Sequence, residues 1–279
     1  KSDYTWTSGP GWAFTDYYHR LKGTEWEPWE YALMKSSRCK LVAVRDKITA
    51  RGLRSHGVIA QAFGNPMMDG FRRVACPENL EKSKRLILLC GSRMPEALRN
   101  FQSLIQALEL VKGFEPLSIL AVTGSEPSLV NLESYLDLNG YQKSLYSVNQ
   151  FGENSLWKKG FLNVFLGQGC FYSWAPWGQI GVANAGTATE QLVGLGIPCL
   201  SLPGKGPQFK YRFALRQSRL LGGAVIPCQN SKILAQRVEY LLKHQTMRME
   251  LVISRKERMG LDGASFEMAI FISKLLFKG

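Results

Sequence analysis

The residues best suited to chemistry lie in the segment 184–198, where an apolar strand is expected to end in a glycine-containing turn and a helix to begin. Helix N-termini present free N–H groups with a partial positive charge, so they bind phosphates. Ala185 and Gly186 leave room for a diphosphate to approach the backbone, and Glu190 could accept hydrogen bonds from the two hydroxyls of a ribose. The segment therefore indicates a binding site for a nucleoside diphosphate.

The same segment also fits a purely structural role. Thr187 and Glu190 have the spacing of a capping box, in which the two side chains satisfy backbone N–H groups at the start of their own helix. Periodicity alone favours neither interpretation, so helix capping and ligand binding both stay open for Glu190 at this point.

A second candidate phosphate site follows the apolar run 85–90. The turn Gly91-Ser92-Arg93 stands at the expected carboxyl end of a strand, with a helix after it. Arg93 could pair with a phosphate through two N–H groups. The alternative is a plain turn in which Arg93 bonds to the nearby Glu96.

A basic loop over residues 203–213 leaves a third strand end. Its glycines and prolines fix the loop, and Lys205, Lys210 and Arg212 give it positive charge. We expect it to face the same cleft, where Lys205 and Gln208 could meet the phosphates or the sugar of the ligand. A solvated basic loop is the alternative.

The elements that must position these residues alternate regularly from residue 85 onward. Apolar runs predict strands over 85–90, 116–122, 161–166, 179–183, 198–202 and 224–226. Helical periodicity predicts helices over 96–111, 128–138, 187–195, 215–221, 231–243, 248–259 and 264–277. This alternation predicts an α/β fold with a parallel sheet covered on both faces, whose ligands sit outside the carboxyl ends of the strands.

The first part of the chain is expected to form a separate domain. It contains a short apolar strand over 41–44, a helical segment and a strand over 59–64, before the break at Asn65-Pro66. We expect Asp69 to cap a turn in this region. The polar stretch that follows, with Pro77, predicts a linker over 76–84 between a first domain, 1–75, and a second, 85–279.

Composition narrows the range of partners. The chain has 35 basic and 22 acidic residues, a net charge of +13, which suits nucleic acid, an anionic membrane surface or a phosphorylated small substrate. The absence of a recognisable nucleic-acid module in the sequence argues against nucleic acid as the partner. The six cysteines and three histidines have no zinc spacing, and the cysteine pattern is typical of reduced thiols in an intracellular protein.

The segment AGTATEQLVGLGIPCLSLPGKGPQFKYRFA resembles the donor-binding motif of GT-B glycosyltransferases, a group that includes lipid A disaccharide synthase and the peptidoglycan N-acetylglucosaminyltransferase. It is most similar to a lipid A disaccharide synthase-related group of cyanobacteria and plastid-bearing organisms. Four further segments resemble the same group: PWEYALMKSSRCKLVAVRD, FGNPMMDGF, ILLCGSRMPEALRNF and RMGLDGAS. The resemblance extends over residues 1–279 with insertions.

This resemblance implies two Rossmann-like domains of GT-B type, with residues 1–75 as the C-terminal part of an acceptor-side domain. The chain begins with Lys1 and not with Met, so we expect a fragment whose first domain is truncated at its N-terminus and whose targeting segment is not visible. The second domain would bind the nucleotide-sugar donor, and a C-terminal helix would return to the first.

The implied reaction is the transfer of a sugar from a UDP-sugar to a lipid-like acceptor, with inversion and without a metal ion or cofactor. A location at the cytoplasmic face of a membrane or in a plastid, with contact to an anionic membrane surface, would follow. The resemblance names no catalytic base. The residues that it implies for donor binding are Gly91, Ser92, Arg93, Asn184, Gly186, Thr187, Glu190, Gln191, Lys205 and Gln208.

Two other functions remain open. A sugar-nucleotide epimerase would use the same cleft, but it needs acidic residues in both domains, and the sequence shows no convincing set. A non-catalytic homologue could bind a nucleotide or a lipid and regulate another process.

Overall fold

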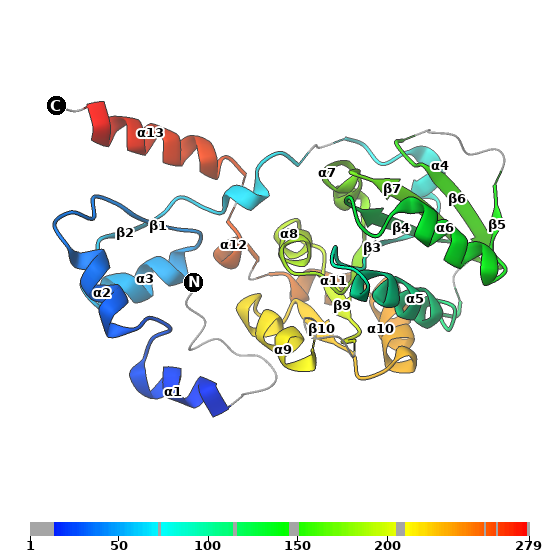
Figure 1. Cartoon of the computed structure of the whole chain (residues 1–279), viewed down its shortest axis with the longest axis horizontal. Helices are drawn as coiled ribbons and strands as arrows, with labels where there is room; N and C mark the ends of the chain where they lie inside the picture. The colour runs from blue at the N-terminus through cyan, green and yellow to red at the C-terminus, as the bar shows by residue number, and fades with distance from the viewer. Residues whose placement is uncertain are drawn as a thin grey trace.

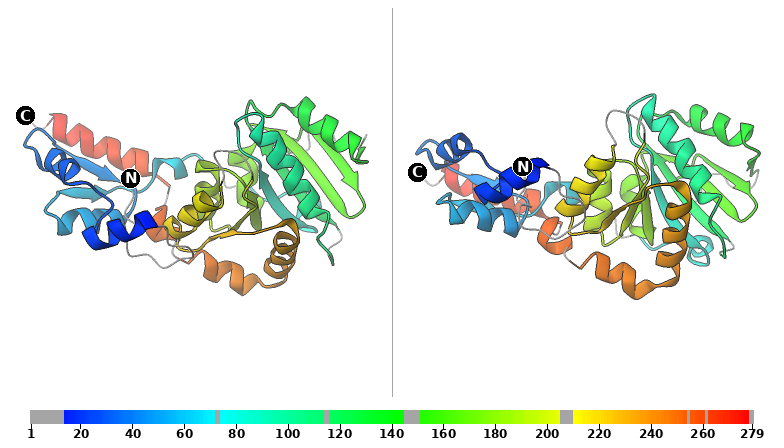
Figure 2. Two further views of the ribbon diagram at one scale, coloured as in Figure 1. Left: turned by 60° about the horizontal axis from the view of Figure 1, so that its bottom comes forward. Right: turned by 90° about the horizontal axis from the view of Figure 1, so that it is seen from below.

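Two lobes of unequal size make up the structure (Figure 1). The computed structural model describes residues 14–71, 74–113, 116–144, 151–204, 210–253, 255–260 and 262–277. The smaller lobe contains the described residues up to 71 together with the C-terminal helix, and the larger lobe is built on a sheet that begins at residue 84. Figure 2 shows the same division from two other directions.

The sheet of the larger lobe has eight strands among the described residues, in the order β10-β9-β8-β3-β4-β7-β6-β5. Its parallel part confirms the α/β fold expected from the alternation of apolar runs and helical segments. The parallel strands are β3 (Lys84–Leu89), β4 (Leu117–Thr123), β7 (Leu162–Gln168), β8 (Ile180–Ala183), β9 (Cys199–Ser201) and β10 (Val225–Pro227).

The edge of the sheet differs from the expectation of an all-parallel sheet. The strands β5 (Gln142–Lys143) and β6 (Ser155–Lys159) run antiparallel there, and β6 returns to β7 through a tight turn. Gly160 makes this turn possible because its φ of 55° lies in the left-handed region that favours glycine. An antiparallel hairpin needs only such a short turn, whereas a parallel connection needs a long crossover.

Helices cover both faces of the sheet because each buried strand presents apolar side chains in both directions. In β3, Leu86 and Leu88 face a core shared with α5 (Glu96–Leu108), α6 (Leu129–Leu138) and α10 (Ser231–Lys243). Ile87 and Leu89 face the opposite core. Residues of α7 (Phe171–Trp174), η2 (Ala175–Trp177) and α8 (Thr187–Gly194) contribute to that second core. Three further helices complete the lobe: α4 (Glu78–Glu81) precedes β3, α9 (Tyr211–Leu220) packs on β10, and α11 (Gln245–Leu251) follows α10.

The smaller lobe has its own small core. Tyr31, Leu53, Val58 and Ala60 are buried there, around two short parallel strands. Its elements are α1 (Phe14–Lys22), α2 (Pro28–Lys35), β1 (Val42–Val44), α3 (Lys47–Ser55), β2 (Ala60–Ala62) and η1 (Pro66–Met68).

Two segments join the lobes and cross each other. The first contains η1; the second contains α12 (Arg255–Arg258) and leads to α13 (Ala264–Phe277). A Cβ at Gly260, where φ is 73°, would lie only 2.9 Å from Cα of Gly64, so the two backbones are in close contact. The helix α13 then lies along the smaller lobe, where the ring of Phe271 packs 5.3 Å from that of Phe63.

The first of these segments also holds the start of α13. The sequence predicts that Asp69 caps a local turn, but its carboxylate caps a helix that is distant in the sequence. It accepts hydrogen bonds from the N–H groups of Gly263 (2.6 Å), Ala264 (3.1 Å) and Ser265 (2.8 Å). Among the ranges described, every helix is too short or too polar to cross a bilayer.

Candidate functional site

A cavity of about 840 Å³ opens at the carboxyl ends of the central strands of the larger lobe. Two turns flank it, one after β3 and one after β8. These strands are neighbours, and the chain leaves them toward opposite sides of the sheet, β3 toward β4 and β8 toward β9. Such a switch point is where open α/β sheets bind their ligands. The cavity is also lined by aromatic side chains, namely Phe171, Tyr172 and Phe213.

The turn after β3 brings its residues to the cavity wall. Gly91 has a φ of 91°, and a Cβ at this position would lie 3.1 Å from the carbonyl oxygen of Asn184. Glycine thus allows the two turns to touch. Ser92 and Arg93 are exposed and line the cavity. Glu96 lines the same cavity, so both the phosphate contact of Arg93 and its bond to Glu96 stay predictions.

The start of α8 presents unused backbone donors to the same cavity. Gly186 is its N-terminal cap, and no side chain in the described ranges caps the helix there. Neither Thr187 nor Ala188 donates its N–H group to an acceptor among the described residues. The space beside Gly186 is open, because a Cβ there would meet nothing within 4 Å. These are the conditions for an anion to approach a helix N-terminus.

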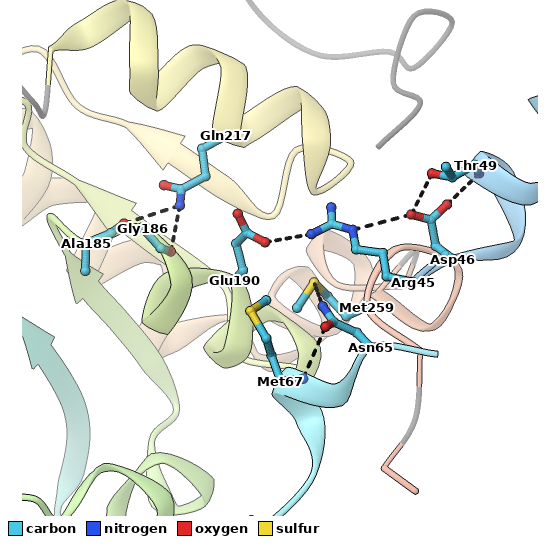
Figure 3. A network of polar contacts seen from close by, with 10 residues as sticks. All are labelled: Arg45, Asp46, Thr49, Asn65, Met67, Ala185, Gly186, Glu190, Gln217 and Met259. Carbon is cyan, nitrogen blue, oxygen red and sulfur yellow. Dashed lines mark hydrogen bonds and ion pairs between the residues drawn. The ribbon is translucent and has the colours of Figure 1, made fainter. Parts of the chain in front are cut away.

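A side chain from α9 fixes the turn before α8. The amide nitrogen of Gln217, a buried residue, donates hydrogen bonds to the carbonyl oxygens of Ala185 (3.3 Å) and Gly186 (3.0 Å). Both carbonyls are therefore turned toward α9 (Figure 3).

Glu190 does not cap its own helix. It is the fourth residue of α8, and its carboxylate accepts a hydrogen bond of 2.7 Å from Arg45 of the smaller lobe (Figure 3). The interpretation that Glu190 serves only as a capping residue is therefore wrong. Glu190 is not among the residues that line the cavity, so its contact with a ribose stays a prediction.

Two further residues of the implied donor site are engaged inside the protein. The buried amide of Asn184 accepts from the N–H of Leu202 (3.0 Å) and donates to its carbonyl oxygen (2.6 Å), which ties β8 to the end of β9. The buried amide of Gln191 donates to the carbonyl oxygen of Met67 (2.6 Å), which ties α8 to η1. Donor contacts by these two amides stay predictions.

Lys205 and Gln208 lie outside the described residues, and their roles stay predictions. The structure therefore gathers Gly91, Ser92, Arg93, Asn184, Gly186 and Thr187 around one cavity, and places Glu190 and Gln191 behind it, toward the smaller lobe.

Sequence reasoning missed Arg45 and Gln217. The pattern Asp46-x-x-Thr49 does identify a helix start, since the Asp46 carboxylate accepts from the N–H of Thr49 at 2.7 Å. Nothing in the sequence links the preceding arginine to a glutamate 145 positions away.

Among the described residues that line the cavity, Cys90 supplies a thiol. Burial raises the pKa of Cys90 to about 12, although a backbone hydrogen bond opposes the shift. The thiol is therefore protonated at neutral pH and is a poor nucleophile. No cluster of His, Cys, Asp or Glu suited to a metal ion occurs among the residues described.

No family model matches the sequence, and a comparison with curated proteins finds no match. Among solved structures, the chain is similar to a putative UDP-N-acetylglucosamine 2-epimerase from Listeria monocytogenes, with a TM-score of 0.58 and 15% identity, covering 86% of this chain and 60% of that one. It is also similar to an S. aureus MnaA–UDP co-structure, with a TM-score of 0.52 and 14% identity, covering 85% of this chain and 60% of that one. The chain spans about 60% of the length of these neighbours. The shared fold is GT-B, the architecture of two Rossmann-like domains.

Proposed function

We propose that the cavity binds a UDP-sugar and that the protein transfers the sugar to a lipid-like hydroxyl acceptor. The observation that supports this most is the convergence of two glycine turns and one helix N-terminus on a single cavity. The N–H groups of Thr187 and Ala188 would neutralise the diphosphate from one side, and Arg93 would do so from the other. Glu190 would accept hydrogen bonds from the ribose.

The transfer itself requires stabilisation of a leaving diphosphate. An acceptor hydroxyl oxygen attacks the anomeric carbon, the bond from that carbon to the diphosphate oxygen breaks, and UDP leaves with the electron pair. Backbone donors fixed at a helix start need no reorganisation as this charge develops. The acceptor hydroxyl also loses its proton, and the described residues supply no base that we can assign.

The lipid-like acceptor is the finer part of the proposal. Exposed apolar side chains on the helices of the smaller lobe support it: Tyr17, Tyr18 and Leu21 of α1, Trp29 and Leu33 of α2, and Phe266, Leu276 and Phe277 of α13. Amphipathic helices with exposed aromatic residues bind the interface of a bilayer. We extend the proposal to an anionic membrane surface, at the cytoplasmic face of a membrane or in a plastid.

An epimerase that acts on a UDP-sugar is the second candidate. It is favoured by the similarity to the Listeria structure, whose name describes a UDP-N-acetylglucosamine 2-epimerase. The two functions separate in one measurement: an epimerase changes the stereochemistry of the free UDP-sugar with no acceptor present, which NMR of the nucleotide sugar detects.

The test of donor binding is Glu190→Gln, followed by titration with UDP. The amide keeps the shape of the side chain and an oxygen for Arg45, so we expect the free energy of unfolding to change by no more than about 1 kcal/mol, the size of a helix cap. UDP binding should weaken by about 1.5–3 kcal/mol, the range of a hydrogen bond to a charged group.

Glu109→Gln is the matched control. Its carboxylate is also held by a cation, Lys159 at 2.9 Å, but it lies away from the cavity. Unchanged UDP affinity in a folded Glu190→Gln protein would remove the ribose contact from the proposal.

A further inference from the structure

A single ion pair connects the helix that starts at the cavity to the smaller lobe. The Arg45 guanidinium donates to Oε2 of Glu190 at 2.7 Å, and the two side chains are only 16% and 19% exposed. The contact lies between the start of α3 and the first turn of α8, and Figure 3 shows the two side chains pointing toward each other across the lobes. Partial burial makes such a contact stronger and more directional than a surface pair.

The direction of the Arg45 side chain is set by its own lobe. Its Nε lies 3.4 Å from Oδ2 of Asp46, whose side chain is fully buried. Asp46 is itself fixed, because its carboxylate accepts from both the N–H (2.7 Å) and the hydroxyl (2.9 Å) of Thr49. A chain of contacts therefore runs from α3 through Arg45 to Glu190.

Arg45 keeps this position although it leaves one donor unused. Its second terminal nitrogen is buried and has no partner among the residues described. An unpaired buried donor costs free energy and requires an explanation. The position of the guanidinium is explained by its contact with Glu190.

The contact with Arg45 uses only part of the hydrogen-bonding capacity of the Glu190 carboxylate. Arg45 uses Oε2 only, and no hydrogen bond reaches Oε1 within the described residues. A carboxylate offers about four acceptor sites, so Glu190 can hold Arg45 and still receive two ribose hydroxyls.

We propose that Arg45 is a positioning residue of the nucleotide site: by holding Glu190 from the other lobe, it sets the carboxylate in the orientation that receives a ribose diol. This inference rests on the proposed function. It adds that the ribose affinity of the larger lobe depends on contact with the smaller one. Because binding linkage is reciprocal, a bound nucleotide then also stabilises the contact between the lobes.

The test compares two ligands, UDP and 2′,3′-dideoxy-UDP, which lacks both ribose hydroxyls. In Arg45→Ala and in Arg45→Met, which keeps the buried stem, UDP should bind about tenfold more weakly, a usual coupling between contacting residues. Binding of 2′,3′-dideoxy-UDP should stay unchanged, because Arg45 acts only through the diol. Arg51→Ala is the control: it removes an exposed positive charge from α3 of the smaller lobe, and it should leave the affinities for both ligands unchanged.

A double variant separates positioning from a general structural effect. Adding Arg45→Ala to Glu190→Gln should weaken UDP no further than Glu190→Gln alone. Equal weakening of both ligands would overturn the inference, because it would indicate a structural role. Unchanged or tighter UDP binding in Arg45→Ala and Arg45→Met would overturn it as well, while the loss in Glu190→Gln alone would leave the proposed function standing. If Glu190→Gln itself binds UDP normally, the proposed ribose contact fails first and the inference falls with it.

Discussion

At the scale of single residues, the charge of Asp69 matters for the link between the lobes. Burial by itself would raise the pKa of this carboxyl. Hydrogen bonds from the side chain and backbone of Ser265 and from the backbone of Gly263 and Ala264 outweigh that effect, so the pKa lies below its ordinary value of 3.8. A carboxyl with a lowered pKa stabilises the folded state above its ordinary pKa, and this contribution is lost as the pH falls through the lowered value.

The predicted consequence is a pH-dependent effect of Asp69→Asn. The amide offers one acceptor oxygen where the carboxylate uses two, so the free energy of unfolding should fall by about 1 kcal/mol at pH 7. The difference from the unchanged protein should shrink as the pH drops below 3.8. Urea unfolding of both proteins at several pH values measures it, with the exposed Asp137→Asn as control. A difference that stays constant down to low pH would contradict the role of the charge.

Residue types and the resemblance together led to residues that line one cavity, but not to the partner of each side chain. The glycine of the turn after β3 could be read from the sequence, because Gly91 has a φ of 91° and its backbone lies close to that of Asn184. Whether Glu190 caps its helix could not be read, since the deciding partner, Arg45, comes from the other lobe. The spacing of residues along the sequence indicates which side chains of one helix can contact each other. It carries no information on a partner that is distant in the sequence.

At the scale of elements, the crossing of the two connecting segments depends on Gly260. A side chain at this position would be strained by the φ of 73° and would press on the backbone of Gly64 and Asn65. We predict that Gly260→Ala lowers the free energy of unfolding by about 1–3 kcal/mol more than Gly263→Ala does, the usual cost of overpacking. Gly263 is a matched control, because its φ is 91° but a Cβ there would meet nothing within 4 Å.

Chemical denaturation of the two variants checks this prediction. Scattering measurements of the radius of gyration would show whether the lobes also separate in Gly260→Ala. Equal destabilisation of the two variants would mean that the crossing segments can move apart without cost.

Most elements of the larger lobe could be predicted because their apolar runs are long and their helices periodic. The hairpin at the sheet edge could not, since β5 has only two residues and β6, with the sequence SLWKK, contains no long apolar run. The segment expected as one helix over 248–259 contains the end of α11 and the separate short helix α12. Val252 and Met259, which directly follow the two helices, are both buried in the second core, so the apolar spacing continues through the break.

At the scale of the whole molecule, the charge and the exposed apolar helices predict an asymmetric membrane contact. With a net charge of +13, the protein should float with anionic vesicles at low salt and much less at high salt, because screening weakens the attraction. Trp29→Ala, at a side chain that is 63% exposed, should reduce the floated fraction without changing the melting temperature. Equal binding to neutral and anionic vesicles, or none to either, would remove the membrane from the proposed function.

The α/β sheet could be predicted from the sequence pattern and the GT-B fold from the resemblance, but the contacts between the lobes could not. Alternating strands and helices specify a sheet with helices on both faces. The relative placement depends on a few contacts between distant residues, such as Gln191 with Met67 and Asp69 with Ser265, whose partners no local pattern identifies.

The return of α13 to the smaller lobe also orders events during synthesis. Phe63 acquires its ring partner Phe271 only after about two hundred further residues have left the ribosome. The larger lobe can fold as soon as its last strand and α10 have emerged, since domains generally fold as units during translation. The smaller lobe, although synthesised first, therefore finishes last, and its apolar surface around Phe63 stays uncovered on the nascent chain until the C-terminal helix arrives.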